Sequence, residues 1–355
     1  MINKRKFTAI DLFAGGGGLS EGLRQAGYDV MSAVEIDYNA VSTYEANHPE
    51  TKVISTDIRL LPSSALEDTL DGRKLDLLAA CPPCQGFSTL TRGNKREDPR
   101  NQLISEVSRL IRDLRPNAIM IENVPGLMTR GENYLTEFLN CLTELGYIYN
   151  FSVLQVADYG VPQLRKRFVL LAGHGYEIKI PSKSHSSLGD EKTLPWKTVA
   201  DAIKDLPKPC ALNELRSLSH ASDHNWHVTR VVSNITKERL RFIKPGGSRF
   251  DLPDELRPNC HKGNNQGYSN VYGRMDWNKP SPTITGGCTT LSKGRFGHPE
   301  ELRTISVREA ALLQTFPLDY KFSATSIDDI CKIIGNALPC LFAKKMAEAC
   351  KKHLN

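Results

Sequence analysis

Strand-like and helix-like segments alternate through the first 172 residues, and this alternation most constrains the fold. The clearest helical segment is Asn101–Arg115, whose apolar residues follow helical spacing and which Pro116 ends. A second helix is expected near Asn133–Leu145, before Gly146. The pattern predicts an α/β fold, with an open, mostly parallel sheet covered on both faces. The predicted strands are Thr8–Phe13, Val30–Ile36, Lys52–Thr56, Leu75–Ala80, Ala118–Glu122, Tyr147–Gln155 and Arg167–Ala172.

After about residue 173 the alternation ends. Short strand-like pieces are separated by turns such as KPGG at 244–247 and GGC at 286–288, which is typical of an irregular lobe. Helical patterns return over 305–316, and Leu338–His353 is expected to form an amphipathic helix that docks back on the first domain. We therefore expect one α/β domain over residues 1–180, completed by 320–355. Residues 181–319 are expected to form a smaller, mostly-β domain.

Composition excludes several classes of protein. Of the 355 residues, 40% are hydrophobic and 24% are charged, as in ordinary globular proteins. The apolar runs are too short to span a bilayer, and the basic start MINKRKF is not followed by the apolar core of a secretory signal. The nine cysteines are odd in number, so a disulfide framework is not expected. We expect a cytoplasmic protein that does not associate with membranes.

The basic charge is concentrated in the middle of the chain. Residues 173–300 contain 19 Lys and Arg against 13 Asp and Glu, whereas residues 1–172 contain 19 against 21. Such an excess is typical of a surface that binds a polyanion such as nucleic acid. A solvated, loop-rich region that happens to be basic is the alternative, and charge by itself does not decide between them.

A glycine-rich turn follows the first predicted strand, in TAIDLFAGGGGLSEG at 8–22. The pattern G-x-G-x-x-G fails because Ser20 or Glu21 occupies the third glycine position, and no P-loop lysine follows. The turn therefore indicates a nucleotide-like cofactor without a pyrophosphate. Glu35, at the end of the second strand, is positioned to bind ribose hydroxyls, and Asp57 an adenine amino group. The alternative is a flexible loop with Glu35 as a helix cap.

A pair of cysteines follows the fourth predicted strand, in LDLLAACPPCQGFSTL. A zinc site would need a second cysteine pair, which the sequence lacks. A thioredoxin-like redox pair would be expected after the first strand rather than the fourth. The third interpretation is a single nucleophile, Cys84, which Pro82-Pro83 presents at the carboxyl end of a central strand. Cys81 is then a buried residue at the strand end.

Six motifs occur in the order found in the C5-cytosine DNA methyltransferase family, which this sequence resembles over 8–172 and about 281–339. The motifs are DLFAGGGG, PPCQGFS, Glu122-Asn123-Val124, QLRKR at 163–167, REAALLQTFP at 308–317 and IGNALP at 334–339. The resemblance implies a Rossmann-like S-adenosylmethionine methyltransferase sheet with a target-recognition domain over 181–319. The N-P-P-Y and D-P-P-Y motifs of amino-group methyltransferases are absent from the sequence.

The resemblance implies catalytic roles for residues in these motifs. Cys84 matches the nucleophile that adds to carbon 6 of cytosine, and Glu122 matches the acid that binds N3 and the amino group. Asn123 would order the cysteine loop. Of Arg165 and Arg167, one would hold the cytosine O2 and the other would organise the site. The alternatives are a turn-capping role for Glu122 and a basic turn for the arginines.

The resemblance also implies the cofactor. The methyl donor would be S-adenosyl-L-methionine, the product S-adenosyl-L-homocysteine, and no metal would be needed. Phe13 would pack on adenine, Glu35 would bind the ribose and Asp57 the adenine amine. The residues that match the family's donor site are Phe13, Gly15, Gly17, Glu35, Ile36, Asp57, Ile58, Pro83, Asn336 and Ala337.

The substrate implied by the resemblance is double-stranded DNA, from which the target cytosine must be swung out. The polar segment Gln85–Arg100 is expected to close over the base, with Gln85, Ser88 and Arg100 contacting DNA, and Thr283 in SPTITGG ends the recognition region. A chain of this length has room for one such region, so we expect one short recognition sequence. A restriction endonuclease acting as a separate chain is a further expected partner, and the protein is expected to be a monomer.

Three other functions stay open at this stage. One is a methyltransferase of the same fold acting on transfer RNA, although the Cys-Phe-Thr signature of that branch is absent from the sequence. Another is a DNA-binding relative without activity, against which Cys84, Glu122, Arg165 and Arg167 all argue. The third is a redox protein that uses Cys81 and Cys84 together.

Overall fold

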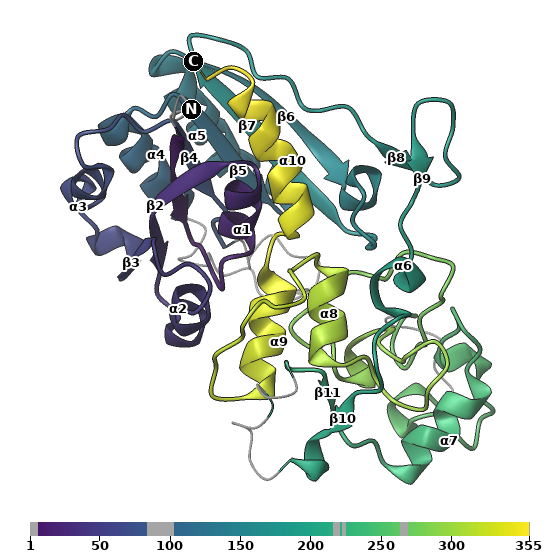
Figure 1. Cartoon of the computed structure of the whole chain (residues 1–355). Coiled ribbons are helices and arrows are strands. Elements are labelled where there is room, and N and C mark those ends of the chain that lie inside the picture. The colour runs from purple at the N-terminus through teal and green to yellow at the C-terminus, as the bar shows by residue number, and fades with distance from the viewer. Residues whose placement is uncertain (1–5, 84–102, 216–220, 222–224, 263–268, 355) are drawn as a thin grey trace, which may run out of the picture. The chain divides into compact units, whose positions relative to one another are not determined.

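The chain folds into two compact units in a computed structural model that describes residues 6–83, 103–215, 221, 225–262 and 269–354 (Figure 1). The first unit comprises Met1–Tyr159, Lys166–Ser184 and Leu338–Asn355. The second unit comprises Gly160–Arg165 and His185–Ala337. Residues 160–165 and 320–337, which the sequence-based boundaries put in the α/β domain, therefore belong to the second unit. The functional roles of the two domains stay predictions.

A seven-stranded sheet forms the centre of the first unit, with the strand order β3-β2-β1-β4-β5-β7-β6. All neighbours from β3 to β5 pair in parallel, and β7 pairs antiparallel with both β5 and β6. The α/β class and the seven predicted strands are thereby confirmed. The strands are β1 (Phe7–Leu12), β2 (Tyr28–Glu35), β3 (Lys52–Ser55), β4 (Leu77–Ala80), β5 (Ala118–Asn123), β6 (Tyr147–Gln155) and β7 (Lys166–His174).

One face of the sheet is covered by the helices α3 (Ser63–Glu67), α4 (Leu103–Leu114) and α5 (Glu132–Glu144). The apolar stripe of α4 faces inward, since Val107, Leu110 and Ile111 are fully buried. These side chains belong to one hydrophobic cluster with alternate residues of β1, β4, β5 and β7. The apolar residues at helical spacing thus lie on one face of α4, which packs into the core of the first unit.

The other face of the sheet is covered by α1 (Gly18–Gln25), α2 (Tyr38–Glu45) and the C-terminal helix α10 (Cys340–Lys351). Figure 1 shows α10, in yellow, running beside α1. The two helices approach closely at Gly22, where a Cβ would lie 2.5 Å from the Cβ of Ala343. The predicted C-terminal helix therefore does dock on the α/β domain.

The chain order reverses between β1 and β4. From β1 the chain proceeds outward through β2 to β3, then returns to β4 on the other side of β1. Ligands of open α/β sheets bind at the carboxyl ends of the strands at such a reversal. The glycine turn follows β1, and Cys81, Pro82 and Pro83, the described start of the cysteine motif, follow β4, so these residues lie at this point.

The second unit is irregular, as expected, but its described residues contain more helix than strand. Its strands, β8 (His185–Ser186), β9 (Leu194–Pro195), β10 (Cys210–Ala211) and β11 (Val228–Thr229), form two two-stranded sheets. The mostly-β expectation was wrong for this part of the chain, because frequent turns stop the pairing after two residues. The helices are α6 (Val199–Ile203), α7 (Asn234–Phe242), α8 (Val307–Leu313) and α9 (Ile327–Asn336).

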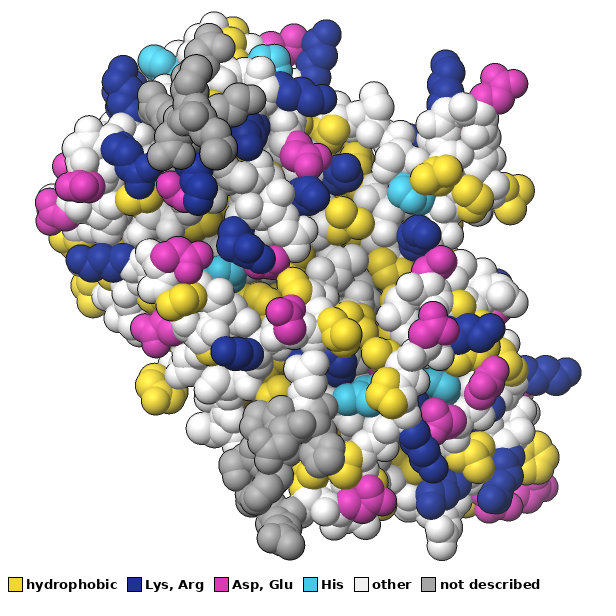
Figure 2. All heavy atoms as spheres, viewed as in Figure 1, with side chains coloured by type: hydrophobic (Ala, Val, Ile, Leu, Met, Phe, Trp, Pro, Cys, Tyr) yellow, Lys and Arg dark blue, Asp and Glu magenta, His cyan; other side chains and the backbone are white. Residues whose placement is uncertain are grey.

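Helix α7 contributes basic side chains to the surface of the second unit. Lys237 and Arg241 are exposed on it, and Lys244 is exposed just beyond its end. Figure 2 shows Lys and Arg side chains mixed with hydrophobic ones over the region of α7. Part of the basic excess of the middle segment is therefore on the surface rather than inside the unit.

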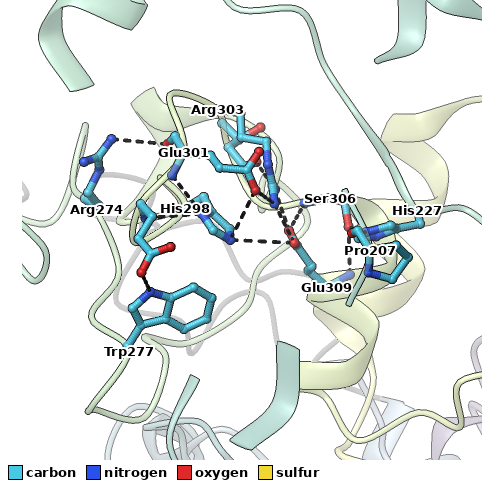
Figure 3. A network of polar contacts seen from close by, with 11 residues as sticks. Pro207, His227, Arg274, Trp277, His298, Glu301, Arg303, Ser306 and Glu309 are labelled. Atoms are coloured by element: carbon cyan, nitrogen blue, oxygen red, sulfur yellow. Dashed lines mark hydrogen bonds and ion pairs between the residues drawn. The ribbon is translucent and has the colours of Figure 1, made fainter. Parts of the chain in front are cut away.

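A polar network stabilises the irregular part of the second unit (Figure 3). Ser306 and Glu309 form a capping box at the start of α8, and Arg303 donates to Glu309 at 2.8 Å. His227 contacts Ser306 through Nδ1 at 2.9 Å. His298 accepts two backbone hydrogen bonds through Nδ1, and burial lowers its pKa to about 4. Buried polar networks of this kind favour one packing where strands are short.

No helix of the described residues is long and apolar enough to cross a membrane.

Candidate active site

The glycine turn after β1 requires unusual backbone angles. Phe13, Gly15 and Gly17 have positive φ values of 62°, 55° and 89°. Gly17 is the N-cap of α1, so its left-handed conformation starts the helix immediately after the strand. Glycine adopts such angles without steric cost, which explains the glycine run at this place in the sequence. The turn leaves main-chain N–H groups near the carboxyl end of β1.

Glu35, at the end of β2, holds this turn in place through hydrogen bonds. Its Oε2 accepts the N–H of Gly15 at 2.8 Å, and its Oε1 accepts the N–H groups of Ile36 and Asp37, each at 2.8 Å. A carboxylate has about four acceptor positions, so capacity for one more donor remains. The role of Glu35 is thus more than that of the helix cap considered from the sequence, because Asp37 caps α2.

The space beside Gly15 in the glycine turn is open among the described residues. A Cβ built on Gly15 meets no atom of these residues within 4 Å. Beside it, Ile36 is 65% exposed. An open cradle, a carboxylate with spare acceptor capacity and an exposed apolar side chain are the groups that would suit an adenosine with a short charged tail. These residues therefore fit S-adenosylmethionine.

Asp57 and Ile58 follow β3 and differ in their surroundings. Asp57 caps the turn 58–60 and pairs with the guanidinium of Arg59, which lowers the pKa of Asp57 to about 2. The side chain of Ile58 is buried in the hydrophobic cluster under the sheet. A place for Ile58 beside adenine stays a prediction, as does the pairing of Asp57 with the adenine amine.

A buried hydrogen-bonded chain lies under the glycine turn and was missed by sequence reasoning. Ser20 on α1 donates to the Oδ2 of Asp11 at 2.7 Å, and Tyr44 on α2 donates to Ser20 at 2.7 Å. Burial raises the pKa of Asp11 to about 7, against the lowering effect of Ser20. The chain connects β1, α1 and α2. Asp11 lies within the DLFAGGGG motif, which was the available signal.

The ends of β4 and β5 are joined through Asn123. Its Nδ2 donates to the carbonyl of Pro82 at 3.2 Å, and its Oδ1 accepts the N–H of Val124 at 2.7 Å. The contact holds the two prolines that lead into the cysteine motif. Burial, with the charge of Glu122 next in size, raises the pKa of Cys81 well above its usual value, so this thiol is kept protonated.

Glu122 and Arg167 form an ion pair at the end of the sheet, with Arg167 Nε 2.6 Å from Glu122 Oε1. Their side chains are only 10% and 13% exposed. Burial lowers the pKa of Arg167, and the Glu122 charge opposes this. Strand β7 brings the pair together because it lies beside β5, whose end carries Glu122. The two charged groups lie side by side, where they could form hydrogen bonds with a polar ring.

Arg165 takes a different place from Arg167. It belongs to the second unit and is buried, and its guanidinium donates to the carbonyl of Ile284 at 2.8 Å and to that of Gly335 at 3.1 Å. These bonds to backbone carbonyls suit a residue that organises a fold. This arrangement separates the two arginines that the sequence left interchangeable.

The remaining described candidates also lie in the second unit. Thr283 donates from its hydroxyl to the carbonyl of Leu164 at 2.8 Å. Asn336, at the end of α9, is exposed, and Ala337 is half-buried just after it. Within this unit Thr283 therefore contacts the short segment, residues 163–165, that contains Arg165.

Cys84, Gln85, Ser88 and Arg100 lie outside the described residues. Pro83, the last described residue before them, is half-buried. Within the described ranges, no group of three or more His, Cys, Asp or Glu side chains could hold a metal ion.

Comparison with known proteins matches the chain to relatives along its whole length. The family model "C-5 cytosine-specific DNA methylase" covers residues 7–352. The Type II methylase M.HgiDII of Herpetosiphon aurantiacus is 38% identical, over 98% of this chain and 96% of that protein. The Type II methyltransferase M1.HphI of Haemophilus parahaemolyticus is 36% identical, over 99% of this chain and 88% of that protein.

A solved structure shares the fold. It is described as a candidate DNA modification methyltransferase encoded within an E. coli prophage, with a TM-score of 0.74 and 24% identity. The match covers 99% of this chain and 100% of that one. With the methyltransferase-type sheet, the glycine turn and the Glu122–Arg167 pair, these matches place the chain in the C-5 cytosine-specific DNA methylase family, whose members methylate carbon 5 of cytosine in DNA.

Proposed function

We propose that this enzyme transfers a methyl group from S-adenosyl-L-methionine to carbon 5 of a cytosine flipped out of a short, specific double-stranded DNA sequence. Cys84 is the nucleophile. The single observation that carries the proposal is the buried Glu122–Arg167 pair beside the strand end that leads into the cysteine motif. The product of the donor is S-adenosyl-L-homocysteine, and no metal takes part.

The pair supplies what the cytosine ring needs during the reaction. The carboxyl of Glu122 binds N3 and the amino group, and the guanidinium of Arg167 binds O2. Negative charge that develops on the ring is stabilised there, because preorganised charged donors in a buried site act strongly. Arg165, whose guanidinium is bonded to backbone carbonyls, organises the site instead.

The Cys84 thiolate adds to carbon 6, and the ring becomes an enamine whose carbon 5 is nucleophilic. Bound S-adenosylmethionine supplies an activated methyl group on a sulfonium, which carbon 5 takes. The proton on carbon 5 is then lost to a base, and the thiolate of Cys84 leaves carbon 6. Cytosine regains its aromatic ring with one added methyl group.

The donor site is formed by the glycine turn and the neighbouring strand ends. Glu35 accepts a ribose hydroxyl with its remaining acceptor capacity, and Gly15 leaves room for the methionine end. Phe13 and Ile36 hold the adenine, with Asp57, Ile58 and Pro83 beside it. Asn336 and Ala337 complete the site.

The second unit recognises the DNA. Its exposed basic side chains suit phosphate contacts, which position a protein on a duplex without reading sequence. Gln85, Ser88 and Arg100 contact DNA around the flipped base, and Thr283 supports the recognition region. The Type II names of the relatives suggest that this chain is the modification enzyme of a restriction–modification system. It then acts as a cytoplasmic monomer, and an endonuclease of the same specificity is a separate chain.

The test is a map of 5-methylcytosine in a host that lacks cytosine methylation. The wild-type chain should methylate one short motif, and the Cys84→Ser variant, expressed at the same level, should methylate none. Soluble wild-type protein that adds no methyl groups to DNA would overturn the proposal. Transfer of labelled methyl groups to transfer RNA would then identify an RNA-acting enzyme, and transfer to neither would identify a binding protein.

A further inference from the structure

Two glutamines of the second unit meet in a fully buried place. Nε2 of Gln163 donates to Oε1 of Gln314 at 2.7 Å, and both residues have no exposed surface. They are 151 positions apart in the sequence. Burying two primary amides is costly unless each of their N–H and C=O groups is hydrogen-bonded. When they are bonded, the hydrogen bonds hold the two side chains and their partners in one orientation.

Backbone partners fix the orientation of the first amide. Nε2 of Gln163 also donates to the carbonyl of Leu313 at 3.3 Å, and its Oε1 accepts the N–H of Ile284 at 3.0 Å. Turning this amide over would set its oxygen against two acceptors. Gln163 therefore ties its own segment to residue 284 and to the end of α8.

The second amide is fixed in the same way. Nε2 of Gln314 donates to the carbonyl of Ile334 at 2.6 Å and to that of Ala337 at 3.1 Å. Its Oε1 is the acceptor for Gln163. The pair therefore reaches from the segment 163–165 to the last turn of α9 and the residue after it.

The segments joined by the pair carry candidate residues of the reaction. Arg165 bonds the carbonyls of Ile284 and Gly335, and Thr283 bonds the carbonyl of Leu164. Residues 165 and 337 are also where the chain leaves the second unit for the first. Asn336 and Ala337 thus follow directly from the turn that Gln314 holds.

We propose that Gln163 and Gln314 are positioning residues for the methyl donor, which set the place of Asn336-Ala337 relative to the segment 163–165. The inference rests on the proposed function, in which Asn336 and Ala337 bind S-adenosylmethionine. An apolar pair of equal volume would fill the same space, but it would not fix the carbonyl of Ala337 in one place. The two amides are therefore needed to fix the position of the Ala337 carbonyl.

The test compares Gln163→Met, Gln314→Met and the double variant with wild type. Methionine keeps the volume and removes all the hydrogen bonds. The matched control is Trp226→Phe, which removes another buried hydrogen bond of the same unit, from Trp226 Nε1 to the carbonyl of Phe322 at 2.7 Å. Thermal melting checks that each variant is folded, and calorimetry without DNA measures the affinity for S-adenosyl-L-homocysteine.

We expect each single methionine variant to weaken binding about tenfold, which corresponds to about 1.4 kcal/mol. The double variant should bind S-adenosyl-L-homocysteine at most about tenfold more weakly than wild type, because the two residues act as one unit. Trp226→Phe should bind within about twofold of wild type. KM for the donor should rise with the loss of affinity, while the KM for DNA should stay within about twofold.

Wild-type affinity in both single variants, or equal weakening by Trp226→Phe, would overturn the inference. If Gln314→Met does not fold, the affinity of Gln163→Met for S-adenosyl-L-homocysteine decides the test. This variant leaves both carbonyl partners of Gln314 in place and should still bind at least about threefold more weakly than wild type. Failure of the proposed function would look different. In that case wild type itself would bind no S-adenosyl-L-homocysteine or methylate no DNA.

Discussion

Arg167 Nε lies 2.6 Å from Glu122 Oε1, across two antiparallel strands that are far apart in the sequence. Both charged groups are largely withdrawn from water, which is costly unless they are paired. The pairing keeps the carboxylate directed and leaves the two groups side by side at the strand end. It is the arrangement on which the proposed chemistry depends most.

Replacing Glu122 by glutamine should lower kcat by about 100-fold, in the range of one lost acid–base group. Shape is kept, so DNA binding should change little. Single-turnover methyl transfer measures this. The control is Glu106→Gln, which breaks an ion pair with Arg109 on α4, where both side chains are partly exposed. That surface pair should matter little for stability or rate. Equal rates for Glu122→Gln and wild type would contradict the assigned role.

The two cysteines of the motif should respond differently to substitution by serine. Cys84→Ser should reduce methyl transfer to background, because a serine hydroxyl is not a comparable nucleophile at neutral pH. Cys81→Ser should keep most activity, since the pKa of Cys81 is raised and its thiol stays protonated. Methyl transfer to a DNA substrate measures both. Equal loss from the two variants would reject a single nucleophile and favour a cysteine pair.

Asp11 should give the protein a pH-dependent stability. Its pKa is about 7 in the folded state and 3.8 for a free carboxyl, so the folded state holds an extra proton between these values. Stability should therefore fall as pH rises from about 4 to 7, then level off. Asp11→Asn should remove this slope and be the more stable protein at pH 8.

Urea unfolding between pH 5 and 8 measures the effect of Asp11. The control is Asp57→Asn, because Asp57, with a pKa of about 2, stays ionised over the whole range. The Asp57→Asn variant should keep the wild-type slope. A wild-type slope in Asp11→Asn would show that another group is responsible.

Alanine at Gly15 should weaken donor binding without unusual loss of stability. Gly15 has a positive φ, and an added Cβ meets no atom within 4 Å in the part of the chain that the structure describes, so the methyl would enter the space assigned to the donor. Gly175 has the same two properties and lies after β7, so Gly175→Ala carries the same backbone strain. Each variant should lose about 1 kcal/mol of stability.

Calorimetry with S-adenosyl-L-homocysteine separates the two alanine variants. Gly15→Ala should bind at least about tenfold more weakly than wild type, and Gly175→Ala should bind as wild type does. Equal affinities in the two variants would mean that the donor does not occupy the space in front of Gly15.

The seven strands and the two motif-bearing strand ends could be predicted from the sequence. The pattern of apolar residues in β1, β4 and β5 is local, and parallel strands bring their carboxyl ends to one edge. Glu35 was therefore predicted as a donor-binding residue from its place at the end of β2, and its role stays a prediction. The buried chain of Asp11, Ser20 and Tyr44 was not found, because polar residues that pair inside a core leave no periodic signal.

The sequence by itself determined the α/β class, the glycine turn and the residues available for chemistry, since these follow from side-chain spacing and short motifs. Only the tertiary structure decided which partners meet. Placing β7 antiparallel between β5 and β6 sets Arg167 against Glu122, whereas Arg165, two residues earlier, is bonded to carbonyls of the second unit. Gln163 and Gln314 pair for the same reason: contacts between distant segments depend on the packing of whole elements, which local sequence does not encode.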